Sequence, residues 1–550
     1  MEPTRRDVLK GAVAAGVVGG PVGALANAME PARSFVDVRR APDLVRAWGK
    51  NGEIALTKRG DAWEGGGVEV HVAGGEVNLR SSVGVTRIGL RWRGDLTTVE
   101  RLLGDHWERS YADLAWHGRM ATRPMPWSFL ANDGKTTHAY GVRVAPGAMC
   151  FWTADNEGVS LWADVRSGGS PVRLGDRILA VCTVLCREGR AGESAFAAAR
   201  AFCKTMCPNP RLAGHPIYGT NDWNYAYGNN SADLIAGVSG LIAELSPNPE
   251  NRPYSVIDDG WSQGGLGHGP WEGNDRFGDM GAFAKRLKVL DVRPGLWFRP
   301  LTTLPGQPDS MKLARNKDAL DPTLPETHEH VRAHMRRFAD WGYEMVKHDF
   351  TSWDLFGRWG FSMGASITGD GWRFHDDTKT NAEIALDLYR TIREGAGATR
   401  LIGCNTFAHL AAGLHEVQRT GDDTSGRSWS RTRRMGVNTL AFRAAQQGTF
   451  YTVDPDIVAI TRDLPWDLNE QWLRLVSSSG TALFVAVQPD FVEEKHKVAL
   501  RKALALAAKP QPVGEPLDWM ETDCPREWRL GGKKTEFAWM GETGGDPFGD

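Results

Sequence analysis

The spacing of apolar residues changes character along the chain. Between residues 36 and about 190, short runs such as 68–72 and 86–92 alternate apolar and polar positions, and Gly and Asp turns separate them. An alternation of period two predicts strands with one buried face. We therefore expect an antiparallel β-sandwich over residues 35–207, ending in a helical stretch before Pro208.

From residue 217 onward, short apolar runs that end in polar or acidic residues alternate with segments of helical spacing. Eight such runs occur, at 217–223, 254–258, 293–298, 344–349, 400–404, 416–420, 449–454 and 482–487. Eight β/α alternations predict a (β/α)8 TIM barrel, which we place at residues 215–505. Residues 506–550 are rich in Pro and Trp and predict a short C-terminal β appendage. The predicted fold is therefore a multidomain α/β protein.

The first 28 residues have the pattern of an export signal. Arg5 and Arg6 precede a weakly apolar stretch of Gly, Ala and Val, and Ala26-Asn27-Ala28 resembles a cleavage site. Together these features predict a twin-arginine signal peptide. We expect the twin-arginine export machinery to carry the folded protein to the periplasm or the outside. The apolar stretch is short and glycine-rich, so we expect no permanent membrane span.

Composition narrows the classes of partner. The chain has 65 Lys+Arg and 67 Asp+Glu, a net charge of −2, so nothing favours a nucleic-acid partner. Its 22 Trp exceed its 20 Phe and 9 Tyr, and aromatic planes suit the apolar faces of sugar rings, although we expect most of the Trp in the core. The 7 Cys are too scattered for a disulfide framework. Whether Cys203 and Cys207 form a bridge stays open.

Candidate catalytic residues follow the predicted barrel strands, at the end where TIM barrels hold their chemistry. Lys347 and Asp349 lie two positions apart and should both face the barrel mouth. Asp349 is either a nucleophilic carboxylate that Lys347 keeps ionised, or half of an ion pair that braces the barrel. Asp422 and Asp423 supply a second carboxylate, or else a loop turn or helix cap. Two carboxylates at one pocket suit glycoside cleavage.

Other polar residues near these strand ends indicate binding. Asp258 and Asp259 could bind a pair of sugar hydroxyls, with Trp261 as a wall beside the ring. Adjacent acids also bind metals, but no further ligand cluster accompanies these two, so we predict no metal and no other cofactor. His328 and His330 form an H-x-H pair at the start of a helix, and we interpret them as solvated helix surface.

In combination, these segments resemble the α-galactosidase (melibiase) clan of glycoside hydrolases, family 36 and its neighbour family 27. The matching pieces occur in family order at 219–225, 258–261, 295–300, 346–350, 403–405, Arg419-x-x-x-Asp423 and 454–456. The upstream segment 104–111 is similar to the sandwich domain before family 36 barrels. The sandwich is shorter than in large family members, the C-terminal β domain is mostly missing, and His348 replaces a more usual residue.

The resemblance implies a role for each candidate. Asp349 matches the nucleophile and Asp423 the acid/base, with Asp422 as the competing candidate. The expected substrate-binding residues are Trp223, Asp258, Asp259, Trp261, Trp297, Lys347, Cys404, Asn405 and Arg419. We expect the two catalytic carboxyl groups about 5–5.5 Å apart, as in retaining enzymes. Asp349 should be ionised and Asp423 protonated more readily, and Cys404 should be a free thiol that faces the substrate.

The implied function is that of a secreted, retaining exo-glycosidase that binds a carbohydrate substrate and hydrolyses α-linked, α-galactosyl glycosides by double displacement. The same machinery could act on a β-L-arabinopyranoside, an α-N-acetylgalactosaminide or an α-glucoside, or transfer the sugar as a transglycosylase. The non-enzymatic alternative is an inactive carbohydrate-binding protein. The presence of both Asp349 and Asp423 argues against it, because a lectin needs neither carboxylate.

Overall fold

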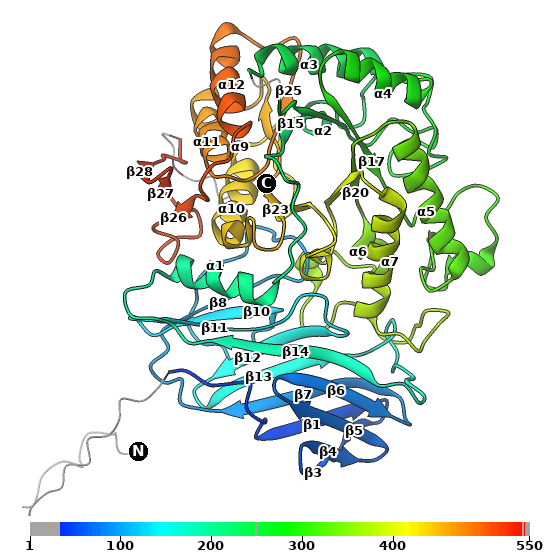
Figure 1. Ribbon diagram of the computed structural model, residues 1–550, viewed down its shortest axis with the longest axis vertical. Coiled ribbons are helices and arrows are strands. Elements are labelled where there is room, and N and C mark those ends of the chain that lie inside the picture. Colours follow the sequence, from blue (N-terminus) through cyan, green and yellow to red (C-terminus); the bar gives the residue numbers. More distant parts are fainter. Residues whose placement is uncertain (1–33, 248–249, 542–543, 545–550) are drawn as a thin grey trace, which may run out of the picture. The chain divides into compact units, whose positions relative to one another are not determined.

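The computed structural model describes residues 34–247, 250–541 and 544 (Figure 1). The predicted signal peptide with Arg5 and Arg6 lies outside the described residues. Within the described part of the chain, no helix combines the length and the hydropathy needed to cross a membrane.

The amino-terminal strands form the predicted antiparallel β-sandwich. They are β1 Leu44–Gly49, β2 Gly52–Ile54, β3 Thr57–Arg59, β4 Ala62–Gly65, β5 Val68–Ala73, β6 Glu76–Ser81, β7 Val85–Arg93, β8 Arg101–Gly104, β9 Met125–Pro126, β10 Ser128–Asn132, β11 Thr137–Val142, β12 Met149–Asp155, β13 Gly158–Asp164 and β14 Leu179–Arg187. One sheet has the order β2-β1-β7-β13-β12-β9, and the other has the order β3-β4-β5-β6-β14-β11-β10-β8. In β5, Val68, Val70 and Val72 are buried while Glu69 and His71 are not, which is the predicted alternation.

The predicted helix after the sandwich is α1, Ala195–Met206. Ser194 caps it, because its side chain accepts a hydrogen bond from the backbone N–H of Ala197. The helix contacts β11 of the sandwich and, on its other side, barrel residues Ala444–Gln446. It therefore joins the two parts through packing as well as through the chain.

Nine short parallel strands form the barrel sheet. They are β15 Tyr218–Asn221, β16 Tyr254–Ile257, β17 Arg293–Phe298, β20 Met345–His348, β21 Arg400–Gly403, β22 Val417–Arg419, β23 Thr452–Asp454, β24 Val458–Ile460 and β25 Leu483–Val487. Their order is β23-β22-β21-β20-β17-β16-β15-β25-β24. Residues 455–457 are all that separates β23 from β24 in the chain. The two ends of the row are also hydrogen-bonded to each other, because the N–H of Ala482, next to β25, donates to the carbonyl of Val453 in β23. The interrupted strand thus pairs with both ends of the row and closes it into the predicted eight-position barrel.

Helices surround the ring of strands (Figure 1). The longer ones are α3 Ala232–Leu245, α4 Met280–Val289, α5 Pro325–Asp340, α7 Asn381–Ala396, α11 Trp466–Ser478 and α12 Glu494–Ala507. The shorter helical segments are α2 Trp223–Ala226, α6 Thr351–Phe356, α8 Ala408–Ala411, α9 Trp429–Thr432 and α10 Thr439–Arg443, and a two-stranded hairpin joins β18 Lys312–Leu313 to β19 Asn316–Leu320. Local sequence sets the helix starts, as at α7, where Thr380 and Glu383 form a capping box.

The carboxyl-terminal appendage is a three-stranded antiparallel sheet of β26 Glu515–Pro516, β27 Glu527–Leu530 and β28 Lys533–Glu536. Its tryptophans are structural: the indole N–H groups of Trp528 and Trp539 both donate to the carbonyl of Pro525, at 3.0 and 2.7 Å. Trp429 of the barrel donates to the carbonyl of Trp539, so the appendage is bonded to the barrel wall.

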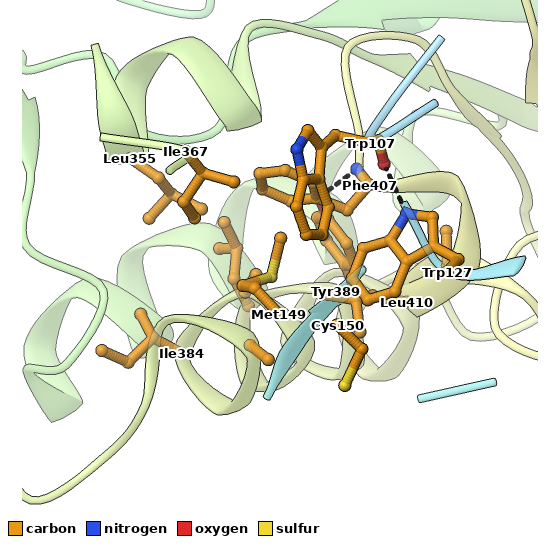
Figure 2. Packing of buried hydrophobic residues seen from close by; sticks show 14 of the residues in the cluster. Trp107, Trp127, Met149, Cys150, Leu355, Ile367, Ile384, Tyr389, Phe407 and Leu410 are labelled. Carbon is orange, nitrogen blue, oxygen red and sulfur yellow. Dashed lines mark hydrogen bonds between the residues drawn. The ribbon is translucent and has the colours of Figure 1, made fainter. Parts of the chain in front are cut away.

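The sandwich and the barrel share a hydrophobic core (Figure 2). Trp107 and Trp127 of the sandwich are buried there with Tyr389, Phe407 and other barrel side chains. The indole N–H of Trp127 donates to the carbonyl of Trp107 at 2.9 Å, and the two rings meet edge to face. This packing fixes the sandwich loop 105–113, which follows β8, against the barrel.

Candidate active site at the barrel mouth

Asp349 lies one residue beyond β20, at the carboxyl end of the barrel. Its N–H donates to the carbonyl of Phe298 at 2.9 Å, which extends the ladder with β17 by one residue. Phe350 then adopts φ +63°, a left-handed conformation that is uncommon for a bulky residue. One carboxylate oxygen of Asp349 accepts the N–H of Phe350 at 2.7 Å, and the other accepts the indole N–H of Trp297 at 3.3 Å. The turn therefore holds a half-buried carboxylate at the mouth.

Lys347 pairs with Asp258 and not with Asp349. Its Nζ lies 2.7 Å from Asp258 Oδ2, and the same oxygen accepts a 2.7 Å hydrogen bond from Asn221. Burial alone would lower the pKa of Lys347, but the Asp258 carboxylate outweighs it and raises that pKa. Of the two alternatives for Lys347, the bracing ion pair with Asp349 is not formed, because Nζ reaches past β17 to Asp258 after β16.

The carboxylates after β15 and β16 are buried close together. Asp222 accepts the backbone N–H of Asp258, and Asp259 accepts the N–H groups of Gly260 and Gly267, each at 2.7 Å. Burial, reinforced by the charge of Asp258, raises the pKa of Asp222 and of Asp259 to about 7. Asp259 thus closes the loop 259–267 over the mouth, a role the sequence did not predict.

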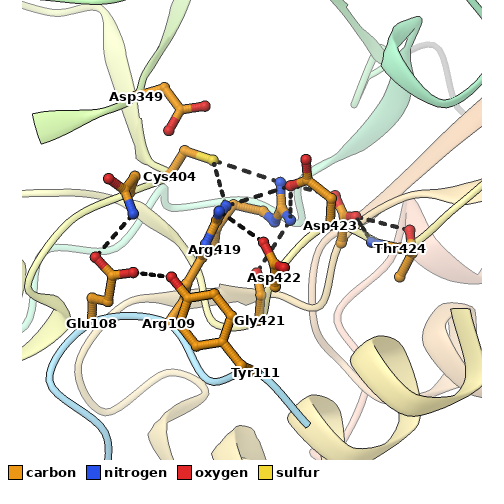
Figure 3. Close-up of polar contacts among 12 residues, drawn as sticks. Glu108, Arg109, Tyr111, Asp349, Cys404, Arg419, Gly421, Asp422, Asp423 and Thr424 are labelled. Carbon is orange, nitrogen blue, oxygen red and sulfur yellow. Dashed lines mark hydrogen bonds and ion pairs between the residues drawn. The ribbon is translucent and has the colours of Figure 1, made fainter. Parts of the chain in front are cut away.

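Asp423 faces two guanidinium groups (Figure 3). Its Oδ1 lies 3.0 Å from Arg419 and 3.4 Å from Arg109. Burial alone would raise the pKa of Asp423, but the charges of Arg419 and Arg109 outweigh it and hold that pKa well below its ordinary value. The expectation that Asp423 is easily protonated is therefore wrong for the free protein, because Arg109 of the sandwich adds a second positive charge beside it.

Asp422 is bound on both oxygens. Oδ1 lies 2.8 Å from Arg109 and Oδ2 lies 2.8 Å from Arg431. By contrast, no described residue bonds to Oδ2 of Asp423, and its side chain is 37% exposed against 17% for Asp422. Of the two neighbours, Asp423 is the one with an oxygen open to a ligand.

Arg419 is a buried structural cation. Only 2% of its side chain is exposed, and it pairs with Asp456 at 2.9 Å as well as with Asp423. Burial raises the pKa of the adjacent Asp454 to about 6. Direct binding of substrate by Arg419 stays a prediction, and the contact that the structure shows is the ion pair that orients Asp423.

Cys404 and Asn405 follow β21. Figure 3 shows Cys404 between Asp349 and the arginine–aspartate cluster, and its Sγ lies 3.6 Å from Arg109 and from Arg419. Asn405 is fully buried, donates to Glu108 at 2.9 Å and accepts from Ser352 at 2.7 Å. Its amide therefore bonds to protein groups on both sides, and the predicted contact with a sugar stays a prediction.

The predicted aromatic residues differ in position. Trp261 is 0% exposed, and its indole N–H donates to the carbonyl of Trp297, so it cannot form a wall of the site and the prediction is wrong. Trp297 is also buried, but it reaches Asp349 through its indole N–H. Trp223 is half-buried at the start of α2 and packs edge to face on Tyr227 at 5.7 Å.

The sequence interpretation missed the contribution of the sandwich. Glu108 and Arg109 belong to loop 105–113, and they contact Asn405, Asp422 and Asp423 of the barrel. The segment 104–111 was singled out only for its resemblance to a sandwich domain. Glu108 and Arg109, adjacent charged residues in a segment that precedes the barrel, were the available signal.

All seven cysteines, which lie in the described part of the chain, have free thiols, as predicted for Cys404, and this includes Cys203 and Cys207. His328 and His330 are half-buried rather than solvated: His328 bonds to Thr391 of α7, and the ring of His330 meets that of His334 at 4.5 Å. Residues 34–247, 250–541 and 544 contain no group of three or more His, Cys, Asp or Glu that could hold a metal ion.

The described part of the chain shares its fold with solved α-galactosidases. The α-galactosidase TtGalA from Thermus thermophilus, solved with p-nitrophenyl α-D-galactopyranoside, matches with a TM-score of 0.58 and 18% identity over 90% of this chain and 98% of that chain. The family 36 α-galactosidase AgaA from Geobacillus stearothermophilus matches with a TM-score of 0.56 and 11% identity over 84% of this chain and 75% of that chain. These likenesses confirm the predicted resemblance at the level of fold. No family model and no curated protein matches the sequence.

Proposed function

We propose that this protein is an exo-acting, retaining glycosidase of the α-galactosidase type. The observation that carries the proposal is the pair of carboxylates at one barrel mouth, Asp349 after β20 and Asp423 after β22, each with a distinct set of partners. The fold shared with family 36 α-galactosidases supports the choice of sugar.

In this mechanism Asp349 is the nucleophile. Its carboxylate attacks the anomeric carbon while the bond from that carbon to the leaving oxygen breaks, and Asp423 gives that oxygen a proton. In the second step Asp423 takes a proton from water, the water oxygen bonds to the anomeric carbon, and the ester to Asp349 breaks. Attack from opposite faces in the two steps retains the configuration.

The arginines around Asp423 affect its two roles differently. They favour the anionic base needed in the second step and disfavour the protonated acid needed in the first. The 3.4 Å contact to Arg109 is the longer of the two. A substrate that draws Arg109 away would raise the pKa of Asp423, so we assign the change between roles to this contact.

We assign binding of the terminal sugar to a buried polar chain and to an aromatic ring near the carboxyl ends of β15, β16 and β20. The Lys347–Asp258–Asn221 chain can exchange hydrogen bonds with hydroxyls, and the half-buried ring of Trp223 offers an apolar face. Other buried residues hold these groups in place: Trp261 bonds to Trp297, Asn405 to Glu108 and Arg419 to Asp423.

We also propose export in the folded state to the periplasm or the outside. The twin-arginine pattern at Arg5 and Arg6 supports it, and free thiols at all seven cysteines are compatible with folding before transport.

The test is turnover of nitrophenyl glycosides by the purified protein. We expect hydrolysis of the α-galactoside in preference to the β-L-arabinopyranoside, α-N-acetylgalactosaminide and α-glucoside, with the α-anomer of galactose formed first in proton NMR. Asp349→Ala should abolish turnover, because no other group forms the ester. Asp233→Ala, at a side chain 90% exposed on α3, is the matched control and should be fully active.

An inverted first product would contradict double displacement. Formation of longer oligosaccharides in place of free galactose would assign a transglycosylase, and binding without turnover of any glycoside would assign a carbohydrate-binding protein.

A further inference from the structure

Beside the catalytic carboxylates lies a group of aromatic rings that the terminal-sugar site does not use. We define it as the aromatic shelf: Phe350, Trp353, Trp359 and Phe361 of the barrel, with Tyr111 of the sandwich. We propose that the aromatic shelf binds the second sugar ring of an oligosaccharide substrate, the ring that becomes the leaving group. This inference rests on the proposed function.

The rings of the aromatic shelf form two groups, and the guanidinium of Arg109 lies against a ring of each. Phe350 and Trp359 meet at 5.5 Å, and Trp353 stacks on Trp359 at 4.8 Å with an angle of 20° between the planes. Tyr111 meets Phe361 edge to face at 5.1 Å. Phe361 is 64% exposed and the other four are half-buried, so ring surface remains open to solvent.

The position of the aromatic shelf fits a leaving group. Phe350 directly follows Asp349, while the guanidinium of Arg109 lies 6.0 Å from the ring of Trp359 and 5.7 Å from that of Tyr111. The same guanidinium contacts Asp423. The aromatic shelf therefore adjoins both carboxylates, and the sugar beyond the scissile bond must lie next to the acid/base.

The aromatic shelf is also held rigidly. The N–H of Gly360, between Trp359 and Phe361, donates to Glu108 at 2.8 Å and to the hydroxyl of Tyr111 at 3.2 Å. A Cβ on Gly360 would lie 2.5 Å from Cγ of Glu108 and 2.7 Å from the Tyr111 ring, so only glycine permits this approach. Pre-set rings lose little entropy on binding.

The chemistry of the surroundings favours a sugar as the occupant. A sugar ring has an apolar C–H face and a rim of hydroxyls, and the aromatic shelf offers planar rings beside polar groups of Arg109 and Ser362. The aromatic shelf lies next to Asp349, which indicates a ligand that contacts the aromatic shelf and Asp349 at the same time. A substrate of two or more linked sugars meets this requirement.

The experiment compares two substrates on the full-length protein. One is α-galactosyl fluoride, which has no second ring, and the other is a trisaccharide of two α-1,6-linked galactosyl units on glucose. Phe361→Leu and Trp359→Leu keep apolar volume but lose the ring plane, while Phe361→Tyr keeps it. We expect the leucine variants to lower kcat/KM for the trisaccharide by roughly fivefold, the scale of one aromatic contact, with the fluoride unchanged and Phe361→Tyr close to the parent.

Equal losses on both substrates, or no loss on either, would overturn the role of the aromatic shelf while leaving the glycosidase intact. Failure of the parent protein to hydrolyse the fluoride would instead contradict the proposed function. In that case calorimetric binding of the trisaccharide still decides the inference, since the leucine variants must bind it less tightly than Phe361→Tyr does.

Discussion

The difference between Asp422 and Asp423 shows how neighbouring residues of the same type acquire different uses. Both are aspartates in one loop. The two carboxylate oxygens of Asp422 pair with Arg109 and Arg431, whereas Oδ2 of Asp423 is open to a ligand. Residue type and spacing alone left the two as rivals. The distinction depends on arginines 313 and nine positions away from Asp422 along the chain, which only the folded chain brings together.

This asymmetry predicts how the two positions respond to substitution. Asp423→Ala should slow hydrolysis of the nitrophenyl α-galactoside by about 10²–10⁴-fold, with the smallest loss for a dinitrophenyl leaving group, which needs little protonation. Added azide should restore part of the second step, because it attacks without a general base. The measurement is steady-state kinetics with and without azide.

Asp422→Ala is the matched variant. It should lose activity through misplacement of Arg109 and show no rescue by azide. Rescue of Asp422→Ala together with none for Asp423→Ala would reverse the assignment.

At the scale of elements, periodicity predicted the strands and helices well, because burial of one face imposes a repeat that the sequence displays. All eight predicted runs coincide with barrel strands. The repeat carries no information on which distant loop docks at the mouth. Loop 105–113 therefore escaped prediction as part of the site, although it supplies Glu108 and Arg109.

The docked loop predicts a shift in pH dependence. Arg109→Leu removes a positive charge 3.4 Å from Asp423 and should raise the pKa of that carboxyl. Because the acid works in its protonated form, the alkaline limb of kcat that Asp423 sets should move to higher pH by the same amount. Arg177→Leu, at a half-buried sandwich arginine paired with Glu383, is the control and should leave the profile unchanged.

A pH profile of Arg109→Leu that overlays the parent, at reduced kcat, would show that Arg109 acts only by holding the loop in place.

At the scale of the molecule, the predicted export route sets the order of folding and transport. Replacement of Arg5 and Arg6 by Lys should leave the protein in the cytoplasm, because the receptor reads the arginine pair. The retained protein should still be folded and active, since no disulfide awaits an oxidising compartment. Cell fractionation with activity assays measures both. Unchanged export of the double variant would indicate another route.

Trp107 and Trp127 share a core with Tyr389 and Phe407, and this contact constrains how the two domains can evolve. A gene fragment that encodes only the barrel would lose Glu108 and Arg109 and would expose the apolar barrel face, with Tyr389 and Phe407, on which the sandwich packs. Recombination between relatives must therefore exchange sandwich and barrel together, or change both sides of this contact at once. The proposed active site therefore evolves as a property of the sandwich and the barrel together, even though both proposed catalytic carboxylates belong to the barrel.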